Sequence, residues 1–182
     1  MASSEAKKRG RWKLALLGAF FLLPMGASWL IWHFDLAPGA AGNYGTLLAP
    51  RASVLPPLVA LKGKWVLVQF DGGACGAACE RKHFFMRQVR RAQGKEMARI
   101  GRLWLVTDAV RPAPGLLAAI EGTVVSDEGT ALAASFPAER SVTEHIYLVD
   151  PLGNLMMRFP LDPDPARVIK DLKHLLKFSG FG

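Results

Sequence analysis

The chain has 182 residues, a formal net charge of +8 at pH 7 and two cysteines. Half of that charge lies in the first 13 residues, where five basic residues accompany a single acidic one. The rest of the chain is only mildly basic, which does not favour a nucleic-acid-binding protein. Glycine-rich nucleotide-binding motifs and the G-x-S-x-G motif of hydrolases are absent. Two cysteines are also too few for a four-cysteine zinc site.

The basic tail is followed by an uncharged segment, Leu14–Trp32, which is long enough to cross a bilayer. Tryptophans lie near both of its ends, where aromatic side chains favour the membrane interface. Because basic residues favour the cytoplasmic side, we predict a cytoplasmic tail over 1–13 and a single-pass inner-membrane anchor over 14–34. The rest of the chain would then be periplasmic. The alternative is a cleaved signal peptide, with the small residues 37–41 at the cleavage site.

Residues 35–57 are rich in proline, glycine and alanine, and predict a linker that continues into an irregular lead-in. Residues 58–182 then form one domain, long enough for a proper core. In chain order we predict a short strand or packing segment at 58–61, a buried strand at 65–70, a helix at 77–92, a buried strand at 103–106, a short helix at 112–120, a brief strand at 123–125, a helical turn at 129–136, strands at 145–150 and 155–159, and a helix at 165–178 capped by Asp164.

This order of elements predicts an α/β fold. A parallel pair of strands needs a crossover helix, and the late strands at 145–150 and 155–159 are close enough in sequence to form a hairpin. A βαβ unit followed by a hairpin and a closing helix is the order of a thioredoxin-like domain, with a mixed central sheet flanked by helices. Its buried strands at 65–70, 103–106 and 146–149 should be adjacent.

Both cysteines, Cys75 and Cys79, lie between the strand at 65–70 and the helix at 77–92. If the first helical turn includes both, their sulfur atoms lie within bonding or shared-ligand distance. The helix N-terminus should favour the thiolate form. Such a pair can cycle between dithiol and disulfide, or its thiolates can bind Cu(I). A structural disulfide or two inert thiols is the alternative.

Basic residues recur from Arg81 to Arg102, and helical periodicity places Lys82 with the arginines on the side opposite the apolar residues. We predict a solvated helix face. The alternative is a docking surface for anionic lipid headgroups or an acidic partner.

The exported part resembles the Sco/SenC family, membrane-anchored thioredoxin-like factors for copper delivery to cytochrome c oxidase. The resemblance rests on the N-terminal anchor, on a strand that runs into a C-x-x-x-C turn at Cys75–Cys79, and on the late segment YLVDPLGN, 147–154. It implies that Cys75 and Cys79 are the catalytic and metal-binding residues. It also implies a cytochrome c oxidase subunit or another exported thiol protein as partner, and copper as Cu(I).

The family's third copper ligand is a histidine, and the matching position in this chain is Val142. The proline that usually follows the family's second cysteine is here Glu80. We therefore expect the two thiolates to suffice for Cu(I), with His145 and His83 as further candidate ligands. His83 would form a row with both cysteines if the helix began early enough, whereas a solvated position is the alternative.

Three hypotheses for function follow from these features. The first is an assembly factor for the respiratory oxidase that handles copper or reduces the thiols of the copper site. The second is a general exported thiol–disulfide oxidoreductase, and the third is a scaffold that has kept the fold without the chemistry.

Overall fold

The computed structural model describes residues 2–34, 42–52 and 56–179 and divides into two units, Met1–Gly42 and Asn43–Gly182. The first unit contains the helix α1 (Ala2–His33). Within α1, the 21 residues Arg11–Ile31 are long and apolar enough to cross a membrane, a criterion that a signal sequence also meets. The helix includes Pro24, which membrane helices tolerate.

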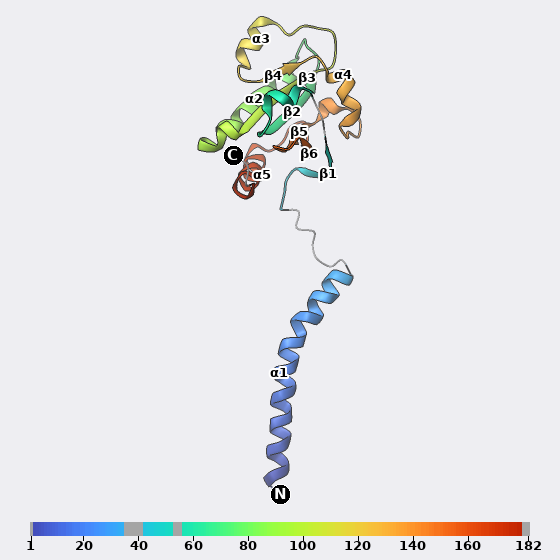
Figure 1. The fold of residues 1–182 in the computed structure, drawn as a ribbon, viewed down its shortest axis with the longest axis vertical. Coiled ribbons are helices and arrows are strands. Elements are labelled where there is room, and N and C mark those ends of the chain that lie inside the picture. The colour runs from blue at the N-terminus through green and yellow to red at the C-terminus, as the bar shows by residue number, and fades with distance from the viewer. Residues whose placement is uncertain (1, 35–41, 53–55, 180–182) are drawn as a thin grey trace. The chain divides into compact units, whose positions relative to one another are not determined.

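The second unit is an α/β domain (Figure 1). Its elements are β1 (Thr46–Ala52), the 3₁₀ turn η1 (Pro56–Leu61), β2 (Trp65–Asp71), α2 (Ala77–Arg91), η2 (Gly94–Arg99), β3 (Ile100–Val106), α3 (Pro114–Ala119), β4 (Val124–Ser126), α4 (Gly129–Leu132), η3 (Ala133–Ser135), η4 (Val142–Glu144), β5 (Ile146–Val149), β6 (Asn154–Phe159) and α5 (Pro165–Phe178). The helix predicted at 165–178 is confirmed, and the Asp164 side chain accepts hydrogen bonds from the backbone N–H groups of Ala166 and Arg167.

The strands form one mixed sheet in the order β1-β6-β5-β2-β3-β4. β2 pairs parallel with β3, and β3 pairs parallel with β4. On its other side β2 pairs antiparallel with β5, so that Leu67 lies opposite both Arg102 and Leu148. The predicted adjacency of the three buried strands is confirmed, and so is the hairpin of β5 and β6.

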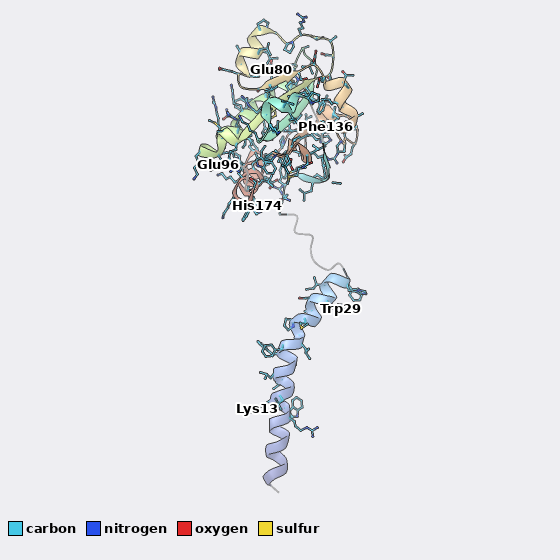
Figure 2. All side chains as sticks on the ribbon, in the orientation of Figure 1. Lys13, Trp29, Glu80, Glu96, Phe136 and His174 are labelled. Carbon is cyan, nitrogen blue, oxygen red and sulfur yellow. A yellow bond between two sulfur atoms is a disulfide. The ribbon has the colours of Figure 1, made fainter. Side chains whose placement is uncertain are left out.

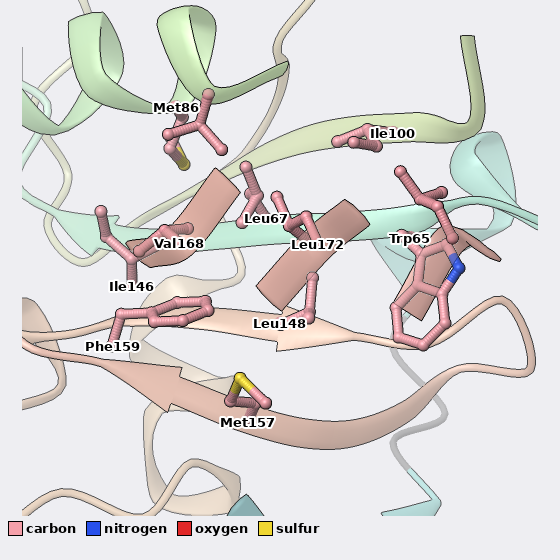
Figure 3. Packing of buried hydrophobic residues seen from close by; sticks show 12 residues of the cluster. Trp65, Leu67, Met86, Ile100, Ile146, Leu148, Met157, Phe159, Val168 and Leu172 are labelled. Atoms are coloured by element: carbon pink, nitrogen blue, oxygen red, sulfur yellow. The ribbon is translucent and has the colours of Figure 1, made fainter. Parts of the chain in front are cut away.

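Apolar side chains cover both faces of the sheet. On one face, Met86 of α2 and Val168 and Leu172 of α5 pack against Leu67 and Leu148 (Figure 3). The opposite face packs against η1, α4 and η3, where Phe136 (Figure 2) contacts a cluster of Phe70 and Tyr147. Because β2 is covered on both faces, its nearly continuous apolar run is explained.

The prediction of an irregular lead-in is wrong for Thr46–Ala52, which forms the edge strand β1 and pairs antiparallel with β6. The pairing shifts register between Leu47 and Arg51, an interval that contains Pro50. Proline cannot donate to a ladder of hydrogen bonds and is tolerated at sheet edges and bulges. Because the edge strand is short and contains this proline, its sequence shows no alternation of apolar and polar residues.

Candidate functional site

The loop between β2 and α2 lies at the carboxyl end of the central strand, against the segment that follows β3. Gly73 donates its backbone N–H to Asp108 Oδ1 at 2.8 Å. A Cβ atom on Gly73 would collide with the carbonyl oxygen of Val110. The glycine therefore permits close packing of two backbones, and this contact helps to define where the following cysteines lie.

Cys75 and Cys79 form a disulfide with a Cα–Cα distance of 5.1 Å. Cys79 lies in the first turn of α2, whereas Cys75 precedes the helix and has a φ of 44°. In the described part of the chain Cys75 is the single non-glycine residue with positive φ. Its backbone N–H donates to the carbonyl oxygen of Gly72 at 3.1 Å, which closes a tight turn. The predicted junction of strand, cysteine pair and helix is confirmed.

His83 lies beneath the disulfide rather than in solvent, because its position one helical turn after Cys79 places it on the buried side of α2. Its ring packs edge-on against Trp104, with a centroid distance of 4.8 Å. The ligand atoms of Cys75, Cys79 and His83 all lie within 4.8 Å of one another. The row of three that the sequence suggested is brought together even though α2 begins after Cys75.

Gln69, a fully buried residue of β2, links the histidine to the second cysteine. Its Nε2 atom lies 2.8 Å from Nε2 of His83 and 3.6 Å from Sγ of Cys79. In the sequence, Gln69 is the single polar residue of the otherwise apolar run Trp65–Phe70. That position was the available signal, because a buried amide needs a hydrogen-bonding partner and the strand ends beside the cysteines.

His83 is neutral at neutral pH. Burial lowers the pKa of its imidazole to about 4, and the positive charges of Arg102 and Lys82 act in the same direction. A neutral imidazole has one unprotonated nitrogen with the lone pair that a metal ligand requires. Because the amide nitrogen of Gln69 can only donate, this nitrogen is Nε2 of His83, and Nδ1 carries the proton. Nδ1 is buried and has no hydrogen-bond partner in the described part of the chain. The two sulfur atoms and this ring therefore offer a soft, partly desolvated ligand set.

The prediction of a solvated basic face is wrong for Lys82, which is 2% exposed. Its Nζ atom forms an ion pair with Asp71 at 2.7 Å and donates to the carbonyl oxygens of Phe70 and Thr143, each at 2.9 Å. Burial lowers the pKa of the Lys82 ammonium, and the hydrogen bond and charge of Asp71 oppose that shift. Lys82 thus ties the end of β2 to the turn before β5.

His145, the other candidate ligand, lies apart from this group. It shares a face of the sheet with Tyr147, at a ring distance of 5.8 Å, and its Nδ1 atom is 3.3 Å from the carbonyl oxygen of Phe159. Tyr147 belongs to the cluster around Phe136, whereas Gln69 points toward α2 on the opposite face. Among the described residues, the only grouping of potential metal ligands is Cys75, Cys79 and His83.

Comparison with solved structures shows a fold shared with Sco proteins. Yeast Sco1 with copper bound is 14% identical, with a TM-score of 0.52, and the match covers 66% of this chain and 80% of that chain. A second crystal structure of yeast Sco1 has the same identity and TM-score, and the match covers 66% of this chain and 84% of that chain. ScoI of Bradyrhizobium japonicum with copper bound is 20% identical, with a TM-score of 0.48 and coverage of 72% and 98%.

The predicted thioredoxin-like fold is therefore confirmed, together with its likeness to the Sco/SenC proteins. No curated protein sequence matches the chain. A family model described as the transmembrane-like, thioredoxin-like, C-terminal domain matches residues 65–179. That match includes the disulfide, His83 and every strand of the sheet except β1, and the chain belongs to this transmembrane-like, thioredoxin-like family.

Proposed function

We propose that the chain is a membrane-anchored, exported thiol–disulfide protein that binds Cu(I) as cargo in the assembly of cytochrome c oxidase. The observation that carries this proposal is the grouping of Cys75, Cys79 and His83, whose ligand atoms lie within 4.8 Å of one another. Sco proteins of the same fold have been solved with copper bound. The long apolar helix before the domain supports a membrane anchor, for which the inner membrane is our proposed location.

Copper uptake starts with reduction of the disulfide by two electrons, after which each cysteine can lose its proton as the metal binds. Cys79 lies in the first turn of α2, where free N–H groups and the helix dipole stabilise a thiolate. The amide nitrogen of Gln69, 3.6 Å from Sγ of Cys79, stabilises the same charge. Two soft thiolates and one neutral imidazole suit Cu(I) better than a hard cation.

A general thiol–disulfide oxidoreductase is the second candidate. It is favoured by the position of Cys75 in the wall of a groove. Both cysteines are buried, but Cys75 lines this groove, whereas Cys79 is held against Gln69. If an external thiolate attacked Sγ of Cys75, Cys79 would leave as a thiolate, and its negative charge would be the better stabilised of the two.

Cu(I) affinity distinguishes the two histidines. The experiment uses the full-length chain in detergent micelles, reduced under anaerobic conditions and titrated with Cu(I) against a coloured competing chelator. We expect His83→Ala to weaken Cu(I) binding by about tenfold or more, which corresponds to about 1.4 kcal/mol. The matched control His145→Ala removes a histidine from the opposite face of the sheet and should change the affinity by less than about twofold.

Cys75→Ser and Cys79→Ser should each abolish tight binding, because one thiolate is lost in either case. If His145→Ala weakens binding as strongly as His83→Ala, the proposed ligand set is incorrect. If the reduced chain binds no Cu(I) but reduces disulfides in exported proteins, the oxidoreductase is the better description.

A further inference from the structure

A groove of about 490 Å³ lies next to Cys75, between α2 and the segment that contains α3. Its walls include Cys75, His83, Phe84 and Arg87 from the loop and α2, together with Arg102 of β3 and Leu116 of α3. The volume is within the range of sites for small molecules. A ligand in this groove would thus lie beside one sulfur atom of the disulfide.

Arg102 is an unusual residue to line such a groove, because its side chain is charged and only 3% exposed. Nη2 donates to the carbonyl oxygen of Glu121 at 2.6 Å. Nε and Nη1 are buried without a hydrogen-bond partner in the described part of the chain, and no described carboxylate forms an ion pair with this guanidinium. A buried cation with unused donors is costly unless an anion satisfies it.

Arg87 adds a second positive charge to the same groove. It donates from Nη1 to the carbonyl oxygen of Ala119 at 3.2 Å, and its Nε atom is buried without a partner among the described residues. The one acidic side chain in the groove lining is Glu80, which is exposed to solvent in the first turn of α2 (Figure 2). The charge inside the groove is therefore positive.

We propose that this groove binds the carboxylate of a small anionic thiol, which reduces the Cys75–Cys79 disulfide. The inference rests on the proposed thiol–disulfide chemistry and names the reductant class that the site accepts. The planar guanidinium of Arg102 can donate two parallel hydrogen bonds to a carboxylate. A thiol that carries an ammonium or a neutral group in place of the carboxylate cannot accept this pair of bonds. The groove is small and adjacent to Cys75, which favours a small thiol over a protein segment as its occupant.

The reaction is a pair of exchanges. The thiolate of the bound molecule attacks Sγ of Cys75, the protein's S–S bond breaks, and Cys79 leaves as a thiolate that takes a proton from solvent. A second equivalent of the small thiolate then attacks the mixed disulfide at the sulfur of the small molecule, which releases Cys75 as a thiolate. Two small thiols are oxidised to one small disulfide, and the protein gains the two electrons that its dithiol form requires.

The test compares three thiols of similar size as reductants of the oxidised full-length chain in detergent micelles. They are 3-mercaptopropionate (anionic), 2-mercaptoethanol (neutral) and cysteamine (cationic), with rates expressed per thiolate present. We expect 3-mercaptopropionate to react about tenfold faster than 2-mercaptoethanol, as one charge-assisted hydrogen bond would produce. Its rate should also saturate with concentration, because it binds before it reacts.

Arg102→Gln and Arg87→Gln should each remove most of that advantage, measured as the ratio of the rate with 3-mercaptopropionate to the rate with 2-mercaptoethanol in the same variant. The matched control is Arg81→Gln, which removes an exposed arginine of α2 that does not line the groove. Should Arg102→Gln fail to fold, Arg102→Lys and Arg87→Gln still test the proposal, since lysine keeps the charge but loses the planar pair of donors.

Equal rates for the three thiols would overturn the anion site. So would a loss of the 3-mercaptopropionate advantage in Arg81→Gln that equals the loss in Arg102→Gln. A rate advantage for an acidic cysteine-containing peptide but not for 3-mercaptopropionate would overturn the assignment to a small molecule. If no thiol opened the disulfide, the proposed redox function itself would fail. The outcome for the groove is thus separable from the outcome for the function.

Discussion

Three polar side chains, Gln69, Lys82 and His83, are buried around the end of β2 and the start of α2, and the charge of the two titratable ones follows from their surroundings. Lys82 keeps a proton beside Asp71 and two carbonyl oxygens. Burial, together with the positive charges of Arg102 and Lys82, lowers the pKa of His83 to about 4, so its imidazole stays neutral. Gln69 connects that neutral ring to Cys79. A change in the redox state of the two sulfur atoms would therefore first affect two uncharged groups, the Gln69 amide and the His83 ring.

The depressed pKa of His83 predicts that the domain loses stability in mild acid. The folded-state pKa is about 4 and the ordinary value is 6.5. As pH falls through this window, the unfolded chain takes up a proton that the folded chain does not, so the free energy of unfolding falls. The full contribution is about 3 kcal/mol.

This prediction is checked by urea unfolding of the oxidised, metal-free protein at about pH 7 and about pH 4. His83→Gln should lose less stability than the parent over the same interval, because glutamine does not titrate. An identical loss in the parent and in His83→Gln would assign the acid sensitivity to other groups.

The cysteines and Lys82 differ in how far the sequence predicts their surroundings. Cys75 and Cys79 were identified because their spacing and their place after a buried strand are local features. The burial of Lys82 could not be predicted, because it depends on Asp71 and on the distant carbonyl of Thr143. Helical periodicity placed that lysine on the polar side of the helix, whereas its tertiary contacts hold it in a buried position.

The edge strand β1 is fixed along one side and at its start. It pairs with β6 in the sheet, and the residues just before it contact α5. The backbone N–H groups of Tyr44 and Gly45 each donate to Oδ2 of Asp171 at 2.9 Å. Asp171 itself is buried. A single carboxylate on the last helix therefore fixes the start of the first strand.

Asp171→Ala should destabilise the domain by about 3 kcal/mol, because it leaves two backbone donors without their charged acceptor. The change is measured as the free energy of unfolding in urea. Faster amide exchange confined to residues 44–52 would locate the loss at β1. The control Asp162→Ala removes an exposed aspartate next to α5 and should cost less than about 0.5 kcal/mol.

The elements that were predicted well carry strong local signals. Trp65–Phe70 is an apolar run interrupted only by Gln69, and Pro165–Phe178 combines a helical period with an aspartate cap and an N-terminal proline. β1 carries none of these signals, since Pro50 and the register shift remove the alternation that marks a strand. Its place in the sheet is set by pairing with β6, more than 100 residues away in the chain.

We infer that the folded domain begins near Asn43, earlier than the sequence suggested, because β1 and the contacts of Tyr44 and Gly45 belong to the compact unit. The segment expected to link the anchor to the domain, 35–57, is correspondingly shorter. Its residues 35–41 and 53–55 lie outside the described part of the chain.

The orientation of the chain across the membrane is predicted from its basic tail. Five basic residues precede the apolar segment, namely Lys7, Lys8, Arg9, Arg11 and Lys13. Because such residues are retained in the cytoplasm, the domain should be exported. A reporter enzyme that is active only outside the cytoplasm, fused after Gly42, should be active. Activity of a cytoplasm-specific reporter at the same position would contradict both the orientation and the proposed oxidase-assembly role.

The shortness of the covalent loop has a further consequence. Cys75 and Cys79 are separated by only four positions, and closing so small a ring restricts the unfolded chain by about 2 kcal/mol, against about 5 kcal/mol for a loop of a hundred residues. The sheet and its two covered faces lie outside the ring. Opening the bond should therefore leave the architecture in place, and a client that docks away from the cysteine loop would meet the same surface in the oxidised and reduced forms.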